Sequence, residues 1–245
     1  RVVVQQPRGN LEAFEPRALV LSLARNLINA ESAQYLQCLL MLRRQRVDLN
    51  FMVDHDPQRF VHFAPAFMKA CIGSDAKEKL TDILCLFISS LEDGHASLGK
   101  YPQPLIQQVL QQTPSQQPEV SSSPCAVTIE GLTSYLESSN GYGKVNALCH
   151  LLRSHLEVLL EEGHLGALKP ILCTFAKQKP PLLEEALLTI RRVVDKSGAT
   201  LSSSKAQGLI RYLAFLADGE LIFNAALGIC DFDMSRAMAR QCQMD

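Results

Sequence analysis

The sequence has no tryptophan, and aromatic residues of all kinds make up only 6% of it. It also has no long apolar run, since uncharged stretches such as ALVLSLA and ILCLFISSL are far too short to cross a bilayer. Acidic and basic residues nearly cancel, leaving a formal net charge of −1 and no overall attraction to nucleic acid or anionic lipid. These absences predict no membrane partner and argue against a broadly basic nucleic-acid binder.

Cysteines at metal-binding spacing are missing as well. The eight cysteines are scattered, most of them at apolar positions of helical patterns, and no CxxC occurs. Free, buried thiols in a reducing compartment are the simplest account of such cysteines. The sequence therefore predicts a cytoplasmic protein, with a nuclear pool also allowed, that has no disulfide framework and holds no metal or cofactor.

Aliphatic residues at helical spacing are what the sequence does have. Hydrophobic residues make up 47% of the chain, and they recur every three or four positions in roughly ten segments. Consecutive amphipathic helices stack as antiparallel pairs, and a row of pairs is an α-solenoid. The Trp and Gly landmarks of a tetratricopeptide repeat are missing, so the repeats are degenerate. We expect an all-α fold, with an α-solenoid over residues 10–245 and a flexible Gln/Ser/Pro loop at about residues 111–123.

The first residues, RVVV, form a β-strand pattern, because branched side chains suit a pleated sheet. No convincing strand pattern follows, so the sequence predicts one isolated strand within residues 1–9, ahead of the helices. A lone strand has no partners for its backbone hydrogen bonds. Either it pairs with strands outside this sequence, or the chain is cut from a longer one.

Capping residues predict several helix boundaries. Asp56 followed by Pro57 predicts a helix start, because the carboxylate caps the helix and the proline ring presets its first turn. Pro65 predicts a break soon afterwards. Asp233 is the predicted cap of the last helix, with Phe232 turned inward. Two further starts are predicted by capping pairs: Asp75 with Glu78, and Ser204 with Gln207.

Two residue groups suggest phosphate or metal binding. GYGK at residues 141–144 has the lysine and glycines of a phosphate loop, but the leading glycine and a preceding strand are missing, which favours a plain loop before a helix. His55 and His62 are common metal ligands. Their spacing places them two helical turns apart, however, and capping by Asp56 explains the cluster more simply.

Two other groups suggest catalysis. Cys149, His150 and His155 offer a thiol and bases, but adjacent residues on a helix diverge, so Cys149 and His150 do not face each other. Asp231 and Asp233 offer a carboxylate pair, for which helix capping is the simpler account. None of these groups makes a credible active site, and the sequence predicts a helical scaffold rather than an enzyme.

A basic cluster of Arg43, Arg44 and Arg46 lies at the predicted end of the second helix. Arginines at a helix C-terminus interact well with the helix dipole and stay solvated. The alternative is a patch that contacts RNA phosphates, without aromatic neighbours on which bases could stack. Arg191 and Arg192 form a second pair with the same two explanations.

Three stretches resemble the family of the largest, scaffold subunit of the Elongator complex. They are RVVVQQPRGNLE, LRRQRVDLNFMVDHDPQRFV and LGICDFDMSRAMA, which lie in the family's order at the two ends of the chain. In that family the first stretch leads from the last strand of a second WD-repeat propeller into a helical solenoid. The resemblance implies that residues 1–9 are the closing strand and exit of an upstream β-propeller, whose ring would supply the hydrogen-bond partners. Residues 103–143 depart from the family pattern.

The resemblance also implies a function. Elongator adds carboxymethyl-type groups to the wobble uridine of certain tRNAs, and a different subunit, with a radical iron–sulfur cluster, performs the chemistry. The present chain lacks the CxxxCxxC that such a cluster needs, which fits the non-catalytic subunit. The implied partners are the catalytic subunit and a double-propeller WD-repeat subunit, with a homodimer contact beyond residue 245. Contact with tRNA at Arg43, Arg44 and Arg46 would be indirect or weak.

An unrelated helical-repeat adaptor, of the vesicle-coat or nuclear-pore type, stays open as the alternative. Such an adaptor shares the helix pattern but does not predict a propeller before the first strand. An enzyme within these residues is the least favoured reading.

Overall fold

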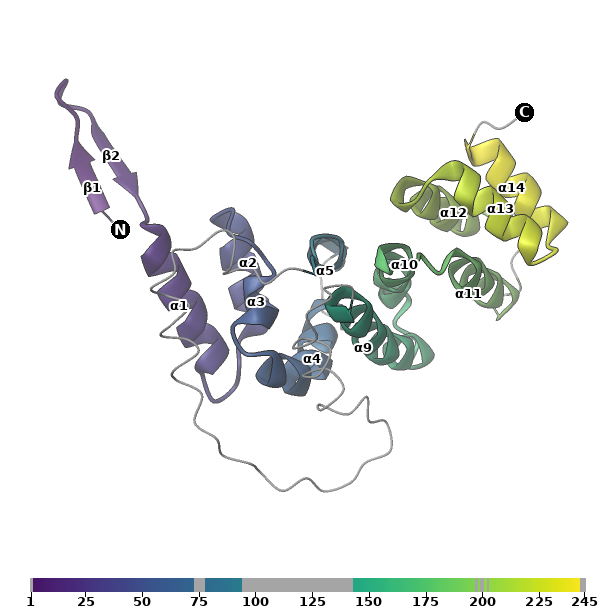
Figure 1. The fold of residues 1–245 in the computed structure, drawn as a ribbon, viewed down its shortest axis with the longest axis horizontal. Coiled ribbons are helices and arrows are strands. Elements are labelled where there is room, and N and C mark those ends of the chain that lie inside the picture. The colour runs from purple at the N-terminus through teal and green to yellow at the C-terminus, as the bar shows by residue number, and fades with distance from the viewer. Residues whose placement is uncertain are drawn as a thin grey trace. The chain divides into compact units, whose positions relative to one another are not determined.

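Figure 1 shows the computed structural model of the chain, which describes residues 2–72, 78–93, 143–196, 198, 201 and 203–242. The chain divides into two compact units. The first unit holds the described residues up to Phe67, and the second holds those from Met68 onward. The predicted loop at residues 111–123 and the predicted cap Asp75 lie outside the described residues.

A β-hairpin, rather than a lone strand, precedes the helices. Strand β1 (Val2–Gln5) pairs in antiparallel fashion with β2 (Leu11–Phe14). Gly9 forms the turn with φ +85°, which glycine adopts without strain, and its N–H donates to the Gln6 carbonyl at 2.8 Å. The prediction of an isolated strand is therefore wrong: PRGN is a hairpin turn, and LEAF is a strand despite the low β propensity of Glu and Ala. That residues 1–9 close an upstream propeller stays a prediction.

Helices make up the rest of the first unit. They are α1 (Arg17–Asn29), α2 (Tyr35–Arg44), α3 (Phe51–Asp54) and α4 (Pro57–Ile72), whose residues from Met68 onward belong to the second unit. Helices α1 and α2 pack against each other. The core of this unit is partly aromatic, because the buried rings of Tyr35 and Phe60 meet edge-on with their centroids 5.3 Å apart.

Arg59 links α4 to the end of α1. Its Nε donates to the Ile28 carbonyl at 2.7 Å, and its Nη2 donates to the Ala30 carbonyl. The last carbonyls of a helix have no partner within the helix. The guanidinium of Arg59 supplies that partner, and its carbon lies 5.2 Å from the centroid of the Phe63 ring.

The start of α4 matches the prediction, and its course does not. Asp56 caps the helix, because its Oδ1 accepts the N–H of Arg59 at 2.9 Å. Pro65 lies inside α4, so the predicted break there is wrong. A proline in a helix removes one backbone hydrogen bond, but Ala64 and Phe67, on either side of it, are buried and hold the helix in place.

The described part of the second unit consists of helices. They are α5 (Glu78–Ser89), α9 (Gly143–Glu161), a 3-10 turn (Leu165–Ala167), α10 (Leu168–Lys177), α11 (Leu183–Lys196), α12 (Ser204–Leu216), α13 (Gly219–Gly228) and α14 (Phe232–Cys242). Helix α10 packs against α5, α9, α11 and α12, and its Ile171 and Leu172 are fully buried. Helix α14 packs against α12 and α13. Successive helices cover one another's apolar faces, which confirms the predicted all-α solenoid. No described helix is both long and apolar enough to cross a membrane.

Helix α14 begins at a different cap from the predicted one. The Oδ1 of Asp231 accepts the N–H of Met234 at 2.9 Å, whereas Asp233 lies in the first turn. Phe232 is 79% exposed, so the prediction that it turns inward is also wrong. Met234 and Met238, one turn apart, are the fully buried residues of this helix, and they leave Phe232 on its outer side.

The cap of α12 lies one residue before the predicted one. Ser203 Oγ accepts the N–H of Ala206 at 3.3 Å, so Ser203 takes the place predicted for Ser204. The Gln207 side chain donates instead to the Leu201 carbonyl at 2.9 Å. A run of serines offers several equivalent caps, and packing of the helix selects among them.

Candidate functional site

The arginine cluster lies where the sequence places it, at the end of α2. Arg43 and Arg44 occupy the last turn, and Arg46 follows with φ +52°. The N–H of Val47 donates to the Leu42 carbonyl at 2.9 Å, which closes the left-handed turn that ends many helices. All three arginines are exposed, and none forms an ion pair within the described residues. Their contact with RNA stays a prediction.

The two candidate metal-binding histidines each have an aromatic neighbour. His55 stacks on Phe51 with ring centroids 5.4 Å apart, and burial, aided by the charge of Arg25, lowers its pKa. His62 is exposed and meets Phe63 edge-on at 4.9 Å. Within the described residues, no group of three or more His, Cys, Asp or Glu side chains is placed to hold a metal ion.

Cys149 is a core residue of α9. It is fully buried, and burial raises the pKa of its thiol to about 12, whereas a nucleophile needs a lowered one. His150 is exposed, on another side of the helix. His155 is half-buried, and burial lowers its pKa. The structure therefore gives Cys149 a packing role in the core.

The GYGK pattern of residues 141–144 ends at the N-terminus of α9. A carboxylate of this chain, that of Asp93, is already bound there. Asp93 Oδ1 accepts the N–H of Val145 at 3.1 Å, and Asp93 Oδ2 lies 3.0 Å from Lys179 Nζ. Lys144 is only 4% exposed, so it does not extend toward solvent as a phosphate-binding lysine does. Gly141 lies outside the described residues. A carboxylate thus occupies the position that a phosphate would take.

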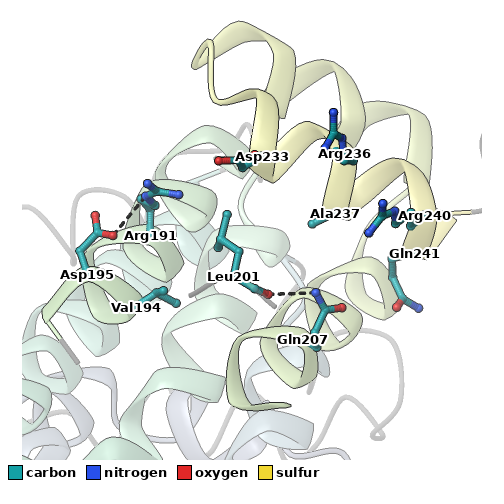
Figure 2. A pocket seen from close by; sticks show the side chains of 10 residues that line it. All are labelled: Arg191, Val194, Asp195, Leu201, Gln207, Asp233, Arg236, Ala237, Arg240 and Gln241. Atoms are coloured by element: carbon teal, nitrogen blue, oxygen red, sulfur yellow. Dashed lines mark hydrogen bonds and ion pairs between the residues drawn. The ribbon is translucent and has the colours of Figure 1, made fainter. Parts of the chain in front are cut away.

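Helices α11, α12 and α14 line a pocket of about 600 Å³, shown in Figure 2. We call it the polar pocket; its lining includes Arg191, Asp195, Gln207, Asp233, Arg236 and Arg240. Arg191 lies 3.3 Å from Asp195 and 3.4 Å from Asp231, the cap of α14. The guanidinium is thus engaged on two sides. Asp231 and Asp233 do not act as a carboxylate pair, because Asp231 has the cap and this ion pair as its partners.

A second hollow, of about 1020 Å³, lies between the 3-10 turn, α10, α11 and α12. We call it the apolar groove; its lining includes Leu165, Leu168, Val193, Leu209, Tyr212 and Phe215. Phe215 is 85% exposed and Leu165 is 61% exposed. Sequence analysis missed this surface, although a signal was present: Lys205, Gly208, Tyr212 and Phe215 recur at helical spacing beside the core stripe of α12.

Buried thiols support the floor of the apolar groove. The hydroxyl of Tyr212 and the thiol of Cys173 lie 2.8 Å apart, within hydrogen-bond distance. A hydrogen bond from Cys85, with others from Tyr212 and Ser89, lowers the pKa of Cys173. The described cysteines are all free. These contacts join α5, α10 and α12 and hold the Tyr212 ring in one orientation.

The fold and these surfaces define an α-solenoid, a class of protein whose stacked helix pairs present extended faces for binding. A family model described as the ELP1 alpha-solenoid matches residues 17–140 and 129–245. The chain therefore belongs to the ELP1 alpha-solenoid family.

Individual relatives agree with this assignment. Elongator complex protein 1 of Drosophila melanogaster is 31% identical over 245 residues, and that of Schizosaccharomyces pombe is 29% identical over 244 residues. The protein of the same name from Saccharomyces cerevisiae is 28% identical over 249 residues. Each comparison covers 100% of this chain and 16% of the relative, so the chain spans about a sixth of the length of these relatives.

Proposed function

We propose that this chain is a non-catalytic scaffold segment of the Elongator complex. In this role it holds the catalytic subunit and a double-propeller WD-repeat subunit, in the cytoplasm, for carboxymethyl-type modification of the wobble uridine of tRNA. The observation that carries the proposal is the match of the ELP1 alpha-solenoid model along nearly the whole chain. The name of the relatives, Elongator complex protein 1, supports membership in that complex.

The chemistry of the candidate residues supports a role in holding rather than in catalysis. The thiol of Cys149 is buried with a raised pKa, and Asp231 caps a helix and pairs with Arg191. Phe215 and Leu165, by contrast, expose apolar side chains to solvent. Exposed apolar surface of this kind is typical of sites where another protein binds.

Affinity purification of the intact protein tests the proposal. A tag on the protein should recover the catalytic and WD-repeat Elongator subunits in near-equal amounts, as identified by mass spectrometry. Deleting the gene should also remove the carboxymethyl-type modification from wobble uridine. Recovery of vesicle-coat or nuclear-pore proteins in their place would favour the helical-repeat adaptor and overturn the proposal.

A weak contact with the tRNA backbone is a second candidate function, because Arg43, Arg44 and Arg46 are all exposed at one helix end. Reversing the three charges to Glu should weaken tRNA binding by the purified complex and flatten its salt dependence by about 0.7–0.9 per lost phosphate contact. Lys69→Glu, at an exposed lysine on α4 to which no RNA contact is assigned, is the control. An unchanged affinity and salt slope would remove this function.

A further inference from the structure

Helix α12 has more apolar surface than the fold uses. Its core face consists of Ala206, Ile210 and Leu213, which are all buried. Tyr212 and Phe215 lie on another face, the one that lines the apolar groove, and Phe215 is 85% exposed. A helix that packs through one face needs only one apolar stripe. Within this second stripe Tyr212 contacts Cys173, but the exposed Phe215 adds apolar area that packing of the described residues does not cover.

Gly208 lies on the same face, in the interior of α12. A glycine there costs roughly 1 kcal/mol in helix stability relative to alanine. A Cβ atom added at Gly208 would meet no atom within 4 Å, and its φ is not in the left-handed region, so neither packing nor backbone geometry in this chain requires glycine. What the missing side chain does provide is room for another polypeptide to lie close against α12.

The charges around the groove have one sign. Among the described residues that line it, the charged ones are Lys169, Lys205 and Arg211. Lys169 Nζ lies 3.6 Å from Asp82, whereas Lys205 and Arg211 have no ion pair within the described residues. The groove thus combines an apolar floor with a cationic rim.

We propose that the apolar groove binds an amphipathic, acidic helix of a partner protein. The helix places apolar side chains against Tyr212, Phe215 and Leu165 and acidic side chains toward Lys205 and Arg211. The segment from Lys205 to Phe215 is about 15 Å long at 1.5 Å per residue, which matches about three turns of a bound helix. This inference rests on the proposed scaffold function and names one surface through which it acts.

Charge and shape together select this occupant. An anionic bilayer would also attract Lys205, Arg211 and Phe215, but an amphipathic helix binds a bilayer by burying a whole apolar face in the lipid. The present surface is instead a hollow of about 1020 Å³. A basic or uncharged helix would fill the hollow without meeting the two unpaired cations, and electrostatic complementarity therefore favours an acidic one.

Photo-crosslinking in the assembled complex identifies the occupant. The intact protein, with p-benzoylphenylalanine in place of Phe215, is purified with its native partners, irradiated and analysed by mass spectrometry. The expected product joins position 215 to a segment of another protein with apolar residues at helical spacing and a net negative charge. Capture of a basic or uncharged segment, of this same chain or a second copy, or of lipid would overturn the proposal.

A synthetic peptide with the captured sequence then tests the groove itself by fluorescence anisotropy with the intact protein. Gly208→Glu places a bulky acid in the groove and should weaken binding by at least about tenfold, as the loss of a central contact does. Gly208→Ala is the matched smaller change: its methyl group takes up only part of the space left for the partner, so it should weaken binding much less than Gly208→Glu does. Both variants replace a mid-helix glycine by a better helix former, so hydrogen exchange of α12 should show that both fold. Equal affinity of the two variants would overturn the proposal.

The two proposals fail in different ways. If Elongator subunits are absent from the purified assembly, the scaffold function fails. If those subunits are present and position 215 forms no crosslink to an acidic segment of another protein, the function stands and the groove proposal fails.

Discussion

The polar pocket and the apolar groove lie along the same two helices, α11 and α12, and both include Val194 in their lining. In the polar pocket, Arg191 has two carboxylate partners from this chain. In the groove, Lys205 and Arg211 have none within the described residues, and apolar side chains face solvent. Arg236 and Arg240 of the polar pocket likewise have no ion pair within the described residues. The groove therefore differs from the pocket chiefly in the apolar area that it exposes for a partner, and volume alone does not mark a binding surface.

Replacing Asp231, which caps α14 and pairs with Arg191 of the polar pocket, should have the largest effect on stability. Asp231→Ala removes the cap of α14 and one partner of Arg191. We expect the local free energy of unfolding to fall by about 1–2 kcal/mol, seen as faster hydrogen exchange in the first turns of α14. Asp233→Ala, which changes a residue that lines the polar pocket but does not cap α14, should change it by less than about 0.5 kcal/mol. Equal effects of the two variants would show that the pocket does not depend on its internal contacts.

A small substitution in the groove should raise the local stability of its helix, whereas the substitution at Asp231 lowers stability. Gly208→Ala fills open space in a helix interior and should raise the local stability of α12 by up to about 1 kcal/mol. Gly163→Ala is the contrasting control, because Gly163 has φ +96° at the end of α9 and alanine there should lower stability by about 1 kcal/mol or more. Hydrogen exchange of the two helices measures both. A loss of stability in Gly208→Ala would mean that the fold itself needs this glycine.

The smallest expected effect is a dependence of stability on pH. It should act through a histidine of the helical core and leave peptide binding in the groove unchanged. Burial lowers the pKa of His155, so the unfolded chain binds a proton more readily than the folded one. The contribution of His155 to stability is therefore complete at a pH above the ordinary histidine value of about 6.5, and it is lost as the pH falls below that value toward the lower pKa of the folded state. The urea-unfolding midpoint of the chain should fall on acidification, and His155→Gln should flatten this slope. Because no described residue that lines either pocket is a histidine, peptide binding in the groove should stay constant over the same range; a parallel loss of binding would contradict this separation.

Periodicity in the sequence predicts the helices well, because each helix buries a stripe with a period near 3.6 residues. The same reasoning predicts Asp56 as a cap, since Asp before Pro has a direct local cause. It fails where tertiary contacts decide between local alternatives. Pro65 stays in a helix because the neighbouring residues are buried, and Asp231 rather than Asp233 caps α14 because Met234 and Met238 set its register.

The sites were harder to predict than the helices. Arg43, Arg44 and Arg46 are recognisable as a helix end because they adjoin each other in the sequence. The polar pocket and the apolar groove are made of residues from different helices, and no spacing rule brings them together. Strand β2 was missed for a related reason: Leu11–Phe14 becomes a strand through pairing with β1, not through its own composition.

The hydrogen bonds of Arg59 to the end of α1 have a mechanical consequence. Its hydrogen bonds to the Ile28 and Ala30 carbonyls tie the last turn of α1 to the first turn of α4, three elements further along the chain. A force on α1 along its axis would be transmitted to α4 directly through the Arg59 side chain. It would not depend only on the aliphatic contacts between neighbouring helices. A hydrogen-bonded side chain of this kind stiffens a solenoid, because it fixes the distance between two of its helices.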